Sequence, residues 1–471
     1  MKTMTAFVVA AAILATAAMA ASQTPADQPL DQLVARASKA LARVEYRRSN
    51  KLGEQALYGQ AVCIDAKRGT FMTGDISTGV PSDELDNFVL FPAGGTGKKV
   101  DAELLGSDPE EGLTFLAAKQ PHDWSELKFS SSAGLNIGQR VISVGLLEPR
   151  LGSPVYMGLA VISAKLRLPG EFVAVTGGTL SNESSPVMTT DGRVIGLVRG
   201  QLPTSMQLYA ANRWNDTMIR ELQHTRGFVP TDEFAHVIAN IPTPQQPRKL
   251  PWIGVVTYEP LTAVDTAATE SLRGRPGVVV GRVIGESPAT KADIRQRDVI
   301  VALDGKPLEA LPTPELVVSN FSRLLSRFSP GAKVKVTILR DGKDQDREVL
   351  LTERPPTPSE AKRYYSARLG LAARDMVKWD EYMAPAMFIK RGVPITGVVP
   401  GGPVHQKLFV NDVITSVNKR RVTNVAELSA VLDPAAEGTA EITLTVLRRG
   451  MEQPVVVTPS GVPVPRGLPG D

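Results

Sequence analysis

Residues 298–306 read DVIVALDGK and residues 412–420 read DVITSVNKR, an offset of 114 positions. The similarity extends downstream, where Leu339-Arg340 has a counterpart in Leu447-Arg448 at an offset of 108. This drift is what small loop differences between two copies of one module would produce. A module of about 100 residues is too long for a solenoid unit, so the repeat predicts two globular domains.

Each copy opens with a glycine between apolar residues, Ile253-Gly254-Val255 in the first and Leu369-Gly370-Leu371 in the second. A β-strand, the Asp-Val-Ile strand, a helix and two closing strands are predicted to follow, with the helices near Glu315–Ser326 and Val425–Leu432. This order resembles that of a PDZ domain. The two PDZ-like domains are placed at 251–355 and 366–459.

In PDZ domains the opening loop presents backbone N–H groups to the C-terminal carboxylate of a peptide, which adds as a strand beside the helix. Glycine has no Cβ, so the backbone can approach the carboxylate, and flanking apolar side chains form a pocket for the last peptide residue. An alternative is that one or both copies only pack against the rest of the chain. The resemblance implies peptide binding by Ile253, Gly254, Val255, Leu369, Gly370 and Leu371.

Ahead of the repeat, residues 51–225 contain short β-type runs separated by glycine, proline and aspartate. Many short strands at this spacing predict an all-β barrel or sandwich, so the fold class is mainly β with α+β modules. A helix is predicted at about 209–224, a proline-bearing linker over 226–250 and a tail over 460–471. The β-type runs cover residues 56–64, 87–91, 100–105, 113–118, 140–147, 155–168, 172–175 and 193–199.

The N-terminus has the pattern of a secretory signal over 1–20. Lys2 precedes an apolar run at 6–15, and Ala18-Met19-Ala20 is a cleavage motif. The run is shorter than the ~20 residues needed to span a bilayer, which argues against a stable membrane anchor. We therefore expect cleavage near Ala20 and a periplasmic or secreted protein. Apolar residues at helical spacing then predict an amphipathic helix of about four turns within 27–50.

Composition excludes several classes of site. The net charge is only +4 and no block of five basic residues occurs, so neither nucleic acid nor an anionic membrane is predicted as a partner. The single cysteine, Cys63, permits no intramolecular disulfide and no thiolate zinc site. We expect no metal ion and no cofactor.

A β-barrel ahead of two PDZ-like modules resembles the HtrA-like serine proteases, and the resemblance covers about 55–460. It implies a trypsin-like double β-barrel over 51–225. The matching patterns are Gly69–Thr73 for the strand that leads to the catalytic histidine, Gly106–Pro109 with Leu113 around the catalytic aspartate, Ile137–Gly145 at the start of the second barrel, and Asn182, Pro186 and Asp191–Gly196 around the nucleophile loop.

The departures from the family pattern lie at the catalytic positions. The position of the base is Ile76, that of the aspartate is Gly112, and that of the nucleophile is Glu183. A register shift offers Ser184 as a fallback nucleophile, but serine needs an adjacent base. The chain's histidines all follow the first ~120 residues, where this fold places its base. They are His122, His224, His236 and His405.

These observations favour an exported pseudoprotease that binds extended or C-terminal peptide segments as a scaffold, adaptor or chaperone-like holder. The alternative is an active serine endopeptidase of periplasmic protein quality control with a displaced triad, which requires a histidine within hydrogen-bond reach of Ser184. A third hypothesis is a structural partner of an active protease paralogue, with blocked PDZ grooves. Family resemblance also implies a homotrimer.

Overall fold

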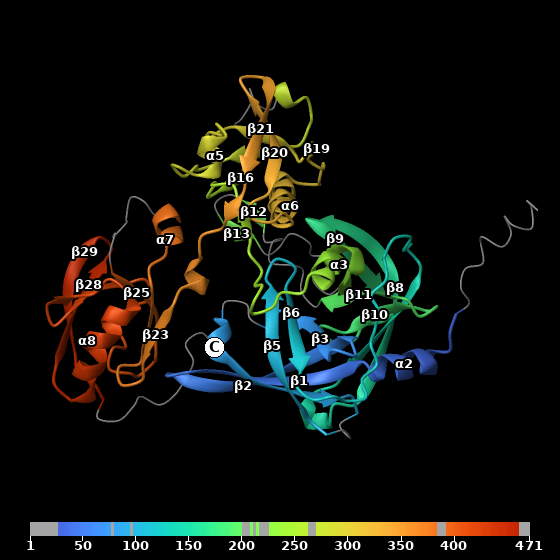
Figure 1. Ribbon diagram of the computed structural model, residues 1–471, viewed down its shortest axis with the longest axis horizontal. Helices are drawn as coiled ribbons and strands as arrows, with labels where there is room; N and C mark the ends of the chain where they lie inside the picture. The colour runs from blue at the N-terminus through green and yellow to red at the C-terminus, as the bar shows by residue number, and fades with distance from the viewer. Residues whose placement is uncertain are drawn as a thin grey trace, which may run out of the picture.

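The computed structural model describes residues 27–76, 80–94, 98–199, 208–210, 213–215, 226–261, 270–383 and 392–460. The predicted signal segment and nearly all of the predicted tail lie outside these ranges. Figure 1 shows the two PDZ-like domains on different sides of a body built from the first half of the chain.

The first half forms two closed six-stranded barrels, which confirms the predicted trypsin-like double barrel. The first barrel has the order β1-β2-β3-β6-β5-β4 and encloses a core that includes Phe71, Phe115 and Leu116. Its strands are β1 (Leu41–Asn50), β2 (Gly53–Asp65), β3 (Thr70–Gly74), β4 (Leu85–Pro92), β5 (Val100–Asp108) and β6 (Leu113–Ala118), with η1 (Ser82–Glu84) ahead of β4.

The second barrel has the order β10-β11-β14-β9-β8-β7 around a separate core of buried aliphatic residues and Phe228. Its inward residues alternate along the strands, as a closed sheet requires. The strands are β7 (Arg140–Leu146), β8 (Val155–Leu168), β9 (Gly170–Thr176), β10 (Pro186–Thr189), β11 (Val194–Arg199) and β14 (Gly227–Pro230), with η2 (Pro149–Leu151) between β7 and β8.

The predicted N-terminal helix is wrong in its second half. Only α2 (Leu30–Ser38) is helical, and it buries Leu33 and Ala37. Residues 41–50 form β1, in which the alternate residues Ala42, Val44 and Tyr46 are buried. The spacing of the apolar residues 41 and 44 is typical of a helix, which is why the sequence predicts one there. In the structure this segment is a strand, because it pairs with β2 and β4.

Two further predictions between the barrels and the PDZ-like domains need correction. Within the segment predicted as a helix at 209–224, the structure has strands β12 (Leu208–Ala210) and β13 (Arg213–Asn215), and residues 216–225 lie outside the described ranges. The predicted linker over 226–250 begins later, because β14 closes the second barrel and α3 (Thr231–Ala239) packs against it.

Both repeat copies fold as a sheet beside one long helix. The first contains β15 (Pro251–Trp252), β16 (Tyr258–Pro260), β17 (Val278–Val280), α5 (Pro288–Lys291), β18 (Val299–Leu303), β19 (Lys306–Pro307), α6 (Pro314–Ser326), β20 (Lys333–Arg340), β21 (Lys343–Leu350) and β22 (Thr352–Glu353). After η5 (Pro358–Glu360), the second contains β23 (Arg363–Ser366), β24 (Leu371–Arg374), α7 (Lys378–Met383), β25 (Val393–Val398), β26 (Val413–Val417), β27 (Arg420–Arg421), α8 (Val425–Glu437), β28 (Ile442–Arg448) and β29 (Met451–Val457).

The repeated Asp and Arg residues form the same buried ion pair in both copies. Asp298 accepts bonds from Nε and Nη2 of Arg340, both at 2.7 Å, and Asp412 accepts the equivalent bonds from Arg448 at 2.8 and 2.6 Å. Each pair joins the Asp-Val-Ile strand to the first strand of the closing hairpin. Bidentate carboxylate–guanidinium pairs are geometrically demanding, which explains why these positions stand out in the repeat.

We predict that Asp298→Asn destabilises the first PDZ-like domain by about 3–5 kcal/mol, because it removes one partner of a buried ion pair. Asp304→Asn is the matched control, since Asp304 is exposed in the following turn. Its φ of 53° is one that asparagine tolerates. Thermal unfolding of both variants checks this, and equal midpoints would contradict it.

Candidate functional site

The position of the catalytic base follows β3, where the chain leaves the first barrel. Ile76 lies there, half-buried, and its side chain packs on the core of that barrel. Its N–H donates to Thr114 Oγ1 at 3.4 Å. An aliphatic side chain in this place cannot accept a proton.

The position of the catalytic aspartate is filled from the other barrel. Gly112 has a φ of +57°, and a Cβ placed on it would lie 2.7 Å from Nη1 of Arg199. That guanidinium, at the end of β11, donates to the carbonyl oxygens of Glu111 and Gly112, the latter at 2.8 Å. A carboxylate at position 112 would therefore require Arg199 to move.

Arg199 is the functional-site residue that sequence reasoning missed. Burial lowers the pKa of its guanidinium, while the carboxylates of Glu183, Glu111 and Asp75 act in the opposite direction. All three neighbours come from the degenerate active-site loops, since Glu183 is the nucleophile position and Glu111 and Asp75 adjoin the other two. A positive charge thus lies among the three positions at which a protease would assemble its triad.

The nucleophile turn holds an exposed Glu183 followed by a buried Ser184. Ser184 has a φ of +65°, and its Oγ accepts the Gly74 N–H at 2.8 Å. Its own N–H donates to the Val198 carbonyl at 3.1 Å. The hydroxyl of the fallback nucleophile is therefore used to join the two barrels.

With Glu183 at the nucleophile position, one of the two amides that would form an oxyanion hole is also engaged. In a trypsin-like site these are the N–H groups of the nucleophile and of the residue two positions before it. The second of these, Ser181 N–H, donates to Ser143 Oγ at 2.6 Å, and Ser181 Oγ donates to the Ser143 carbonyl at 3.0 Å. Ser185 Oγ is likewise bonded, donating to Asn182 and accepting from Gln60.

The described histidines lie away from Ser184. The ring of His122 is 4.6 Å from that of Trp124, and Nε2 of His236 is 3.9 Å from Oε1 of Glu111. His405 lies in the second PDZ-like domain, and His224 lies outside the described residues. Among the residues that the structure describes, no histidine is a hydrogen-bond partner of Ser184.

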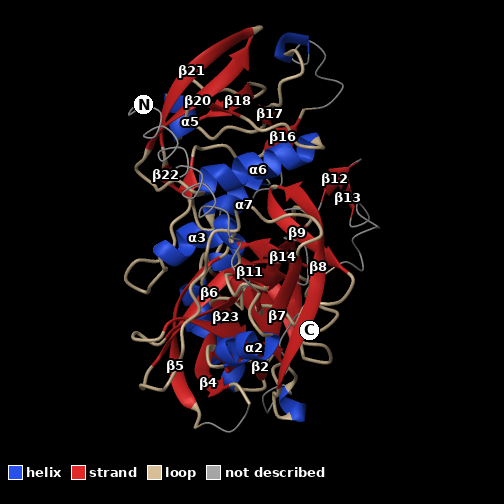
Figure 2. Cartoon of the chain, turned by 90° about the vertical axis from the view of Figure 1, so that its right-hand side faces the viewer, coloured by secondary structure: helices blue, strands red, loops and turns tan. Residues whose placement is uncertain are grey.

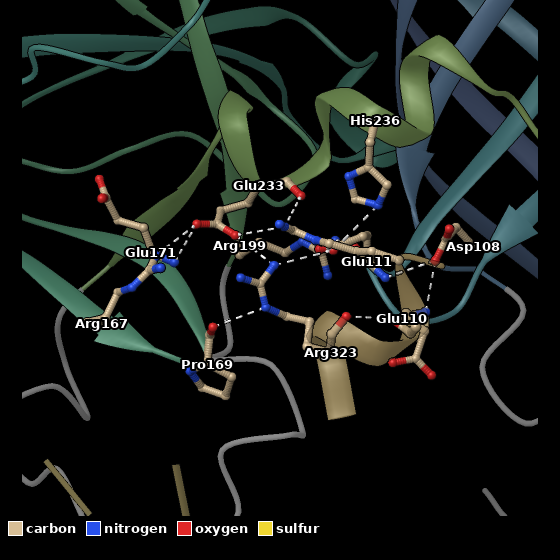
Figure 3. Close-up of polar contacts among 12 residues, drawn as sticks. Asp108, Glu110, Glu111, Arg167, Pro169, Glu171, Arg199, Glu233, His236 and Arg323 are labelled. Atoms are coloured by element: carbon tan, nitrogen blue, oxygen red, sulfur yellow. Dashed lines mark hydrogen bonds and ion pairs between the residues drawn. The ribbon is translucent and has the colours of Figure 1, made fainter. Parts of the chain in front are cut away.

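Behind this site, buried charges connect the barrels to the first PDZ-like domain (Figure 3). Glu233 of α3 pairs with Nη1 of Arg323 of α6 at 2.7 Å and with Nη2 of Arg327 at 3.3 Å. Glu111 is 3.5 Å from the same Arg323. Burial raises the pKa of Glu111 to about 7, although Arg323 and Arg327 oppose the shift. Figure 2 shows α6 between the PDZ-like sheet and the second barrel.

In the first PDZ-like domain the opening loop has the geometry that its glycine predicts. Gly254 has a φ of +96°, and a Cβ placed there would lie 2.2 Å from the side chain of Ser287. Its N–H makes no hydrogen bond to any described residue, and the loop leads through Ile253 and Val255 towards β16. β16 is an edge strand, paired only with β17 among the described strands.

The second opening loop, predicted to bind a carboxylate through Leu369, Gly370 and Leu371, differs from the first in its hydrogen bonding. Leu369 and Leu371 are buried on either side of Gly370. The Gly370 N–H donates to the Ser366 carbonyl at 2.8 Å, within a tight connection between β23 and β24. The predicted amide donor is therefore already bonded to the chain itself.

Sequence comparisons agree with this architecture. Residues 60–197 match the trypsin-like peptidase domain family, and residues 254–351 and 362–447 each match the PDZ domain family. The chain is 25% identical over 369 residues to the probable periplasmic serine endoprotease DegP-like of Hahella chejuensis, covering 75% of this chain and 71% of the relative. The chain is HtrA-like.

Other relatives of this HtrA-like chain carry similar names. The periplasmic pH-dependent serine endoprotease DegQ of Escherichia coli is 27% identical over 362 residues, covering 75% of this chain and 71% of DegQ. A probable periplasmic serine endoprotease DegP-like of Chlamydia muridarum is 28% identical over 356 residues, covering 72% and 64%.

Two solved structures show the same fold. The HtrA-type protease AlgW with tripeptide has a TM-score of 0.52 at 22% identity, covering 70% of this chain and 99% of AlgW. The same protease with decapeptide has a TM-score of 0.51 at 20% identity, covering 70% and 100%. Within the ranges that the structure describes, the HtrA-like chain has no helix with the length and apolar character needed to cross a bilayer.

We predict that Glu111→Gln stabilises the HtrA-like chain relative to wild type as the pH rises from about 4.5 to 8. The folded pKa of about 7 lies above the ordinary 4.5, so the folded state binds the extra proton in this window, and ionising the buried carboxyl costs stability. The difference should reach up to about 3 kcal/mol above pH 7. Exposed Glu103→Gln is the control, and a pH-independent difference in unfolding would contradict the prediction.

Proposed function

We propose that this HtrA-like chain is a pseudoprotease that holds polypeptide segments without cleaving them. The observation that carries the proposal is the state of Ser184, whose hydroxyl accepts the Gly74 N–H at 2.8 Å and has no described histidine beside it. Ile76 and Gly112 offer no group that could replace the missing base and its orienting carboxylate.

Binding is assigned to the first PDZ domain. Its edge strand β16 lies beside α6, and the rings of Tyr258 and Phe321 pack edge-to-face at 5.0 Å where the two elements meet. An extended peptide can add to such an edge through main-chain hydrogen bonds, with its carboxylate at the Gly254 amide. The AlgW structures with a tripeptide and a decapeptide support a peptide as the ligand class.

The proposed cellular compartment is the periplasm. The relatives from Hahella chejuensis, Escherichia coli and Chlamydia muridarum are all named as periplasmic. A secretory signal over residues 1–20 is the matching prediction from the sequence. The family resemblance implies a homotrimer, and association with an active protease paralogue is a separate hypothesis.

The second candidate function is serine endoproteolysis, because these relatives are named as serine endoproteases. Catalysis would require Ser184 Oγ to leave the Gly74 amide and meet a base. It would also require the Ser184 N–H to be released from the Val198 carbonyl before it could stabilise an oxyanion.

We expect no covalent labelling of the purified chain by a fluorophosphonate probe and no cleavage of unfolded casein above that of Ser184→Ala. The reason is that a serine hydroxyl without a base is a weak nucleophile at neutral pH. Escherichia coli DegQ serves as the positive control for both assays. Labelling or cleavage that is lost in Ser184→Ala would establish the endoprotease instead.

For the binding role, we expect C-terminal peptides selected from a library to bind the full chain and to lose affinity when their carboxylate is amidated. Gly254→Ala should weaken binding at least ~10-fold, because its Cβ would collide with Ser287 and its φ is unfavourable for alanine. Gly285→Ala is the matched control, since a Cβ there meets nothing within 4 Å. Fluorescence anisotropy measures both, and equal affinity of the two variants would remove the assignment.

A further inference from the structure

The strand that should accept a peptide in the second PDZ domain already has a partner on both edges. β24 pairs with β25 on one edge and with β23 on the other, where β23 also contacts α8. In the first PDZ domain the corresponding edge belongs to β16 and has no paired strand among the described residues. Figure 1 shows β23 running alongside α8 on the side that faces the barrels.

The direction and register of β23 are those of a bound C-terminal peptide. It runs antiparallel to β24, from Arg363 opposite Arg374 to Ser366 opposite Leu371. Its C-terminal end therefore lies at the glycine loop, as the end of a peptide would. The Ser366 carbonyl accepts the Gly370 N–H at 2.8 Å, in the place of a carboxylate oxygen.

The side chains of β23 alternate as those of a peptide in a groove would. Tyr364 and Ser366 are each 5% exposed, and Tyr364 is part of the core of the domain. The phenol of Tyr364 donates to Asp433 of α8 at 2.5 Å. Two side chains spaced two residues apart thus fill the space between β24 and the helix.

The remaining two side chains face the first barrel and bind one buried carboxylate. Tyr365 Oη donates to Glu84, which is 6% exposed, and Nη1 of Arg363 is 3.8 Å from the same group. Arg48 of β1 and Asn50 complete its surroundings, at 3.7 and 3.1 Å. The filled groove is therefore tied to the barrel by Glu84.

This strand is additional to the repeat. In the first copy, β15 precedes the opening loop and pairs with β22 at the end of the domain. The equivalent contact in the second copy is made by Arg368, whose carbonyl accepts the Ser460 N–H at 3.2 Å. β23 lies upstream of that contact and has no strand counterpart among the described residues of the first copy, so it is a segment that folds back beside β24.

We infer that residues 363–366 are an internal ligand of the second PDZ domain, held in place through Glu84, and that this groove does not accept free peptide C-termini in the resting chain. The inference rests on the proposed peptide-binding function, because it assigns that function to the first PDZ domain alone. The ligand that fits the second groove is a peptide ending in the chain's own Arg-Tyr-Tyr-Ser sequence.

The test uses the full chain carrying Gly254→Ala, so that the first groove is blocked, and a fluorescent peptide of residues 361–366 with a free carboxylate. In a second protein, residues 363–366 are also replaced by Gly-Ser-Gly-Ser, which empties the second groove. We expect the emptied chain to bind the peptide at least ~10-fold more tightly than the parent. Equal binding by both proteins, or binding by neither, overturns the inference.

Hydrogen exchange on the unreplaced chain gives an answer that does not depend on the replacement folding. We expect the β24 amides to be protected, and Tyr365→Phe to speed their exchange, because it removes one bond to Glu84 without touching the core. Exposed Tyr58→Phe on β2 is the control. Unprotected β24 amides in wild type overturn the inference. A wild-type chain that binds no C-terminal peptide in a carboxylate-dependent way counts instead against the proposed function.

Discussion

The arrangement of the barrels and the first PDZ domain depends on carboxylates and guanidiniums that are buried together. Glu233 and Glu111 come from the barrel half of the chain, and Arg323 and Arg327 come from α6. The two guanidiniums depend on Glu233 in particular, because an unpaired charge in a low-dielectric interface is strongly destabilising. The helix α6, which packs beside the edge strand β16, is thereby fixed against the barrels.

Polar groups are also paired within the degenerate active site, so this site is an internally bonded structure and not a protease site that lacks only its triad. Arg199 fills the space beside Gly112 and satisfies carbonyl oxygens there. Ser181 and Ser184 place their amide and hydroxyl in bonds across the site. Groups that a protease leaves free for its substrate are bonded here to other groups of the chain. Restoring catalysis would therefore require several simultaneous changes.

Much of this architecture follows from local patterns. The spacing of short apolar runs predicted most barrel strands, and β6 and β8 were predicted with the bounds that the structure has. The repeated Asp and Arg residues marked both PDZ domains. Turn glycines such as Gly254 revealed their role because a positive φ is a local property.

What the sequence did not reveal depends on contacts between distant segments. The residues that become β1 carry apolar positions compatible with helix or strand, and pairing partners up to 50 residues away decide between them. Arg199 looks like an ordinary charged residue at a strand end, and its burial arises only when two barrels meet. β23 pairs within a short hairpin, but its place beside α8 depends on a helix 60 residues further on.

Among the described strands, β16 is the single edge proposed to accept a peptide, and this has a consequence for stoichiometry. A protein with a single strand that accepts a peptide is monovalent, so each chain can bind an unfolded polypeptide at one point only. Retention of a long client would then need several chains acting together, since linked sites raise the effective concentration of a second contact. The filled groove of the second PDZ domain thus makes clustering of protomers, rather than tandem modules within one protomer, the source of avidity.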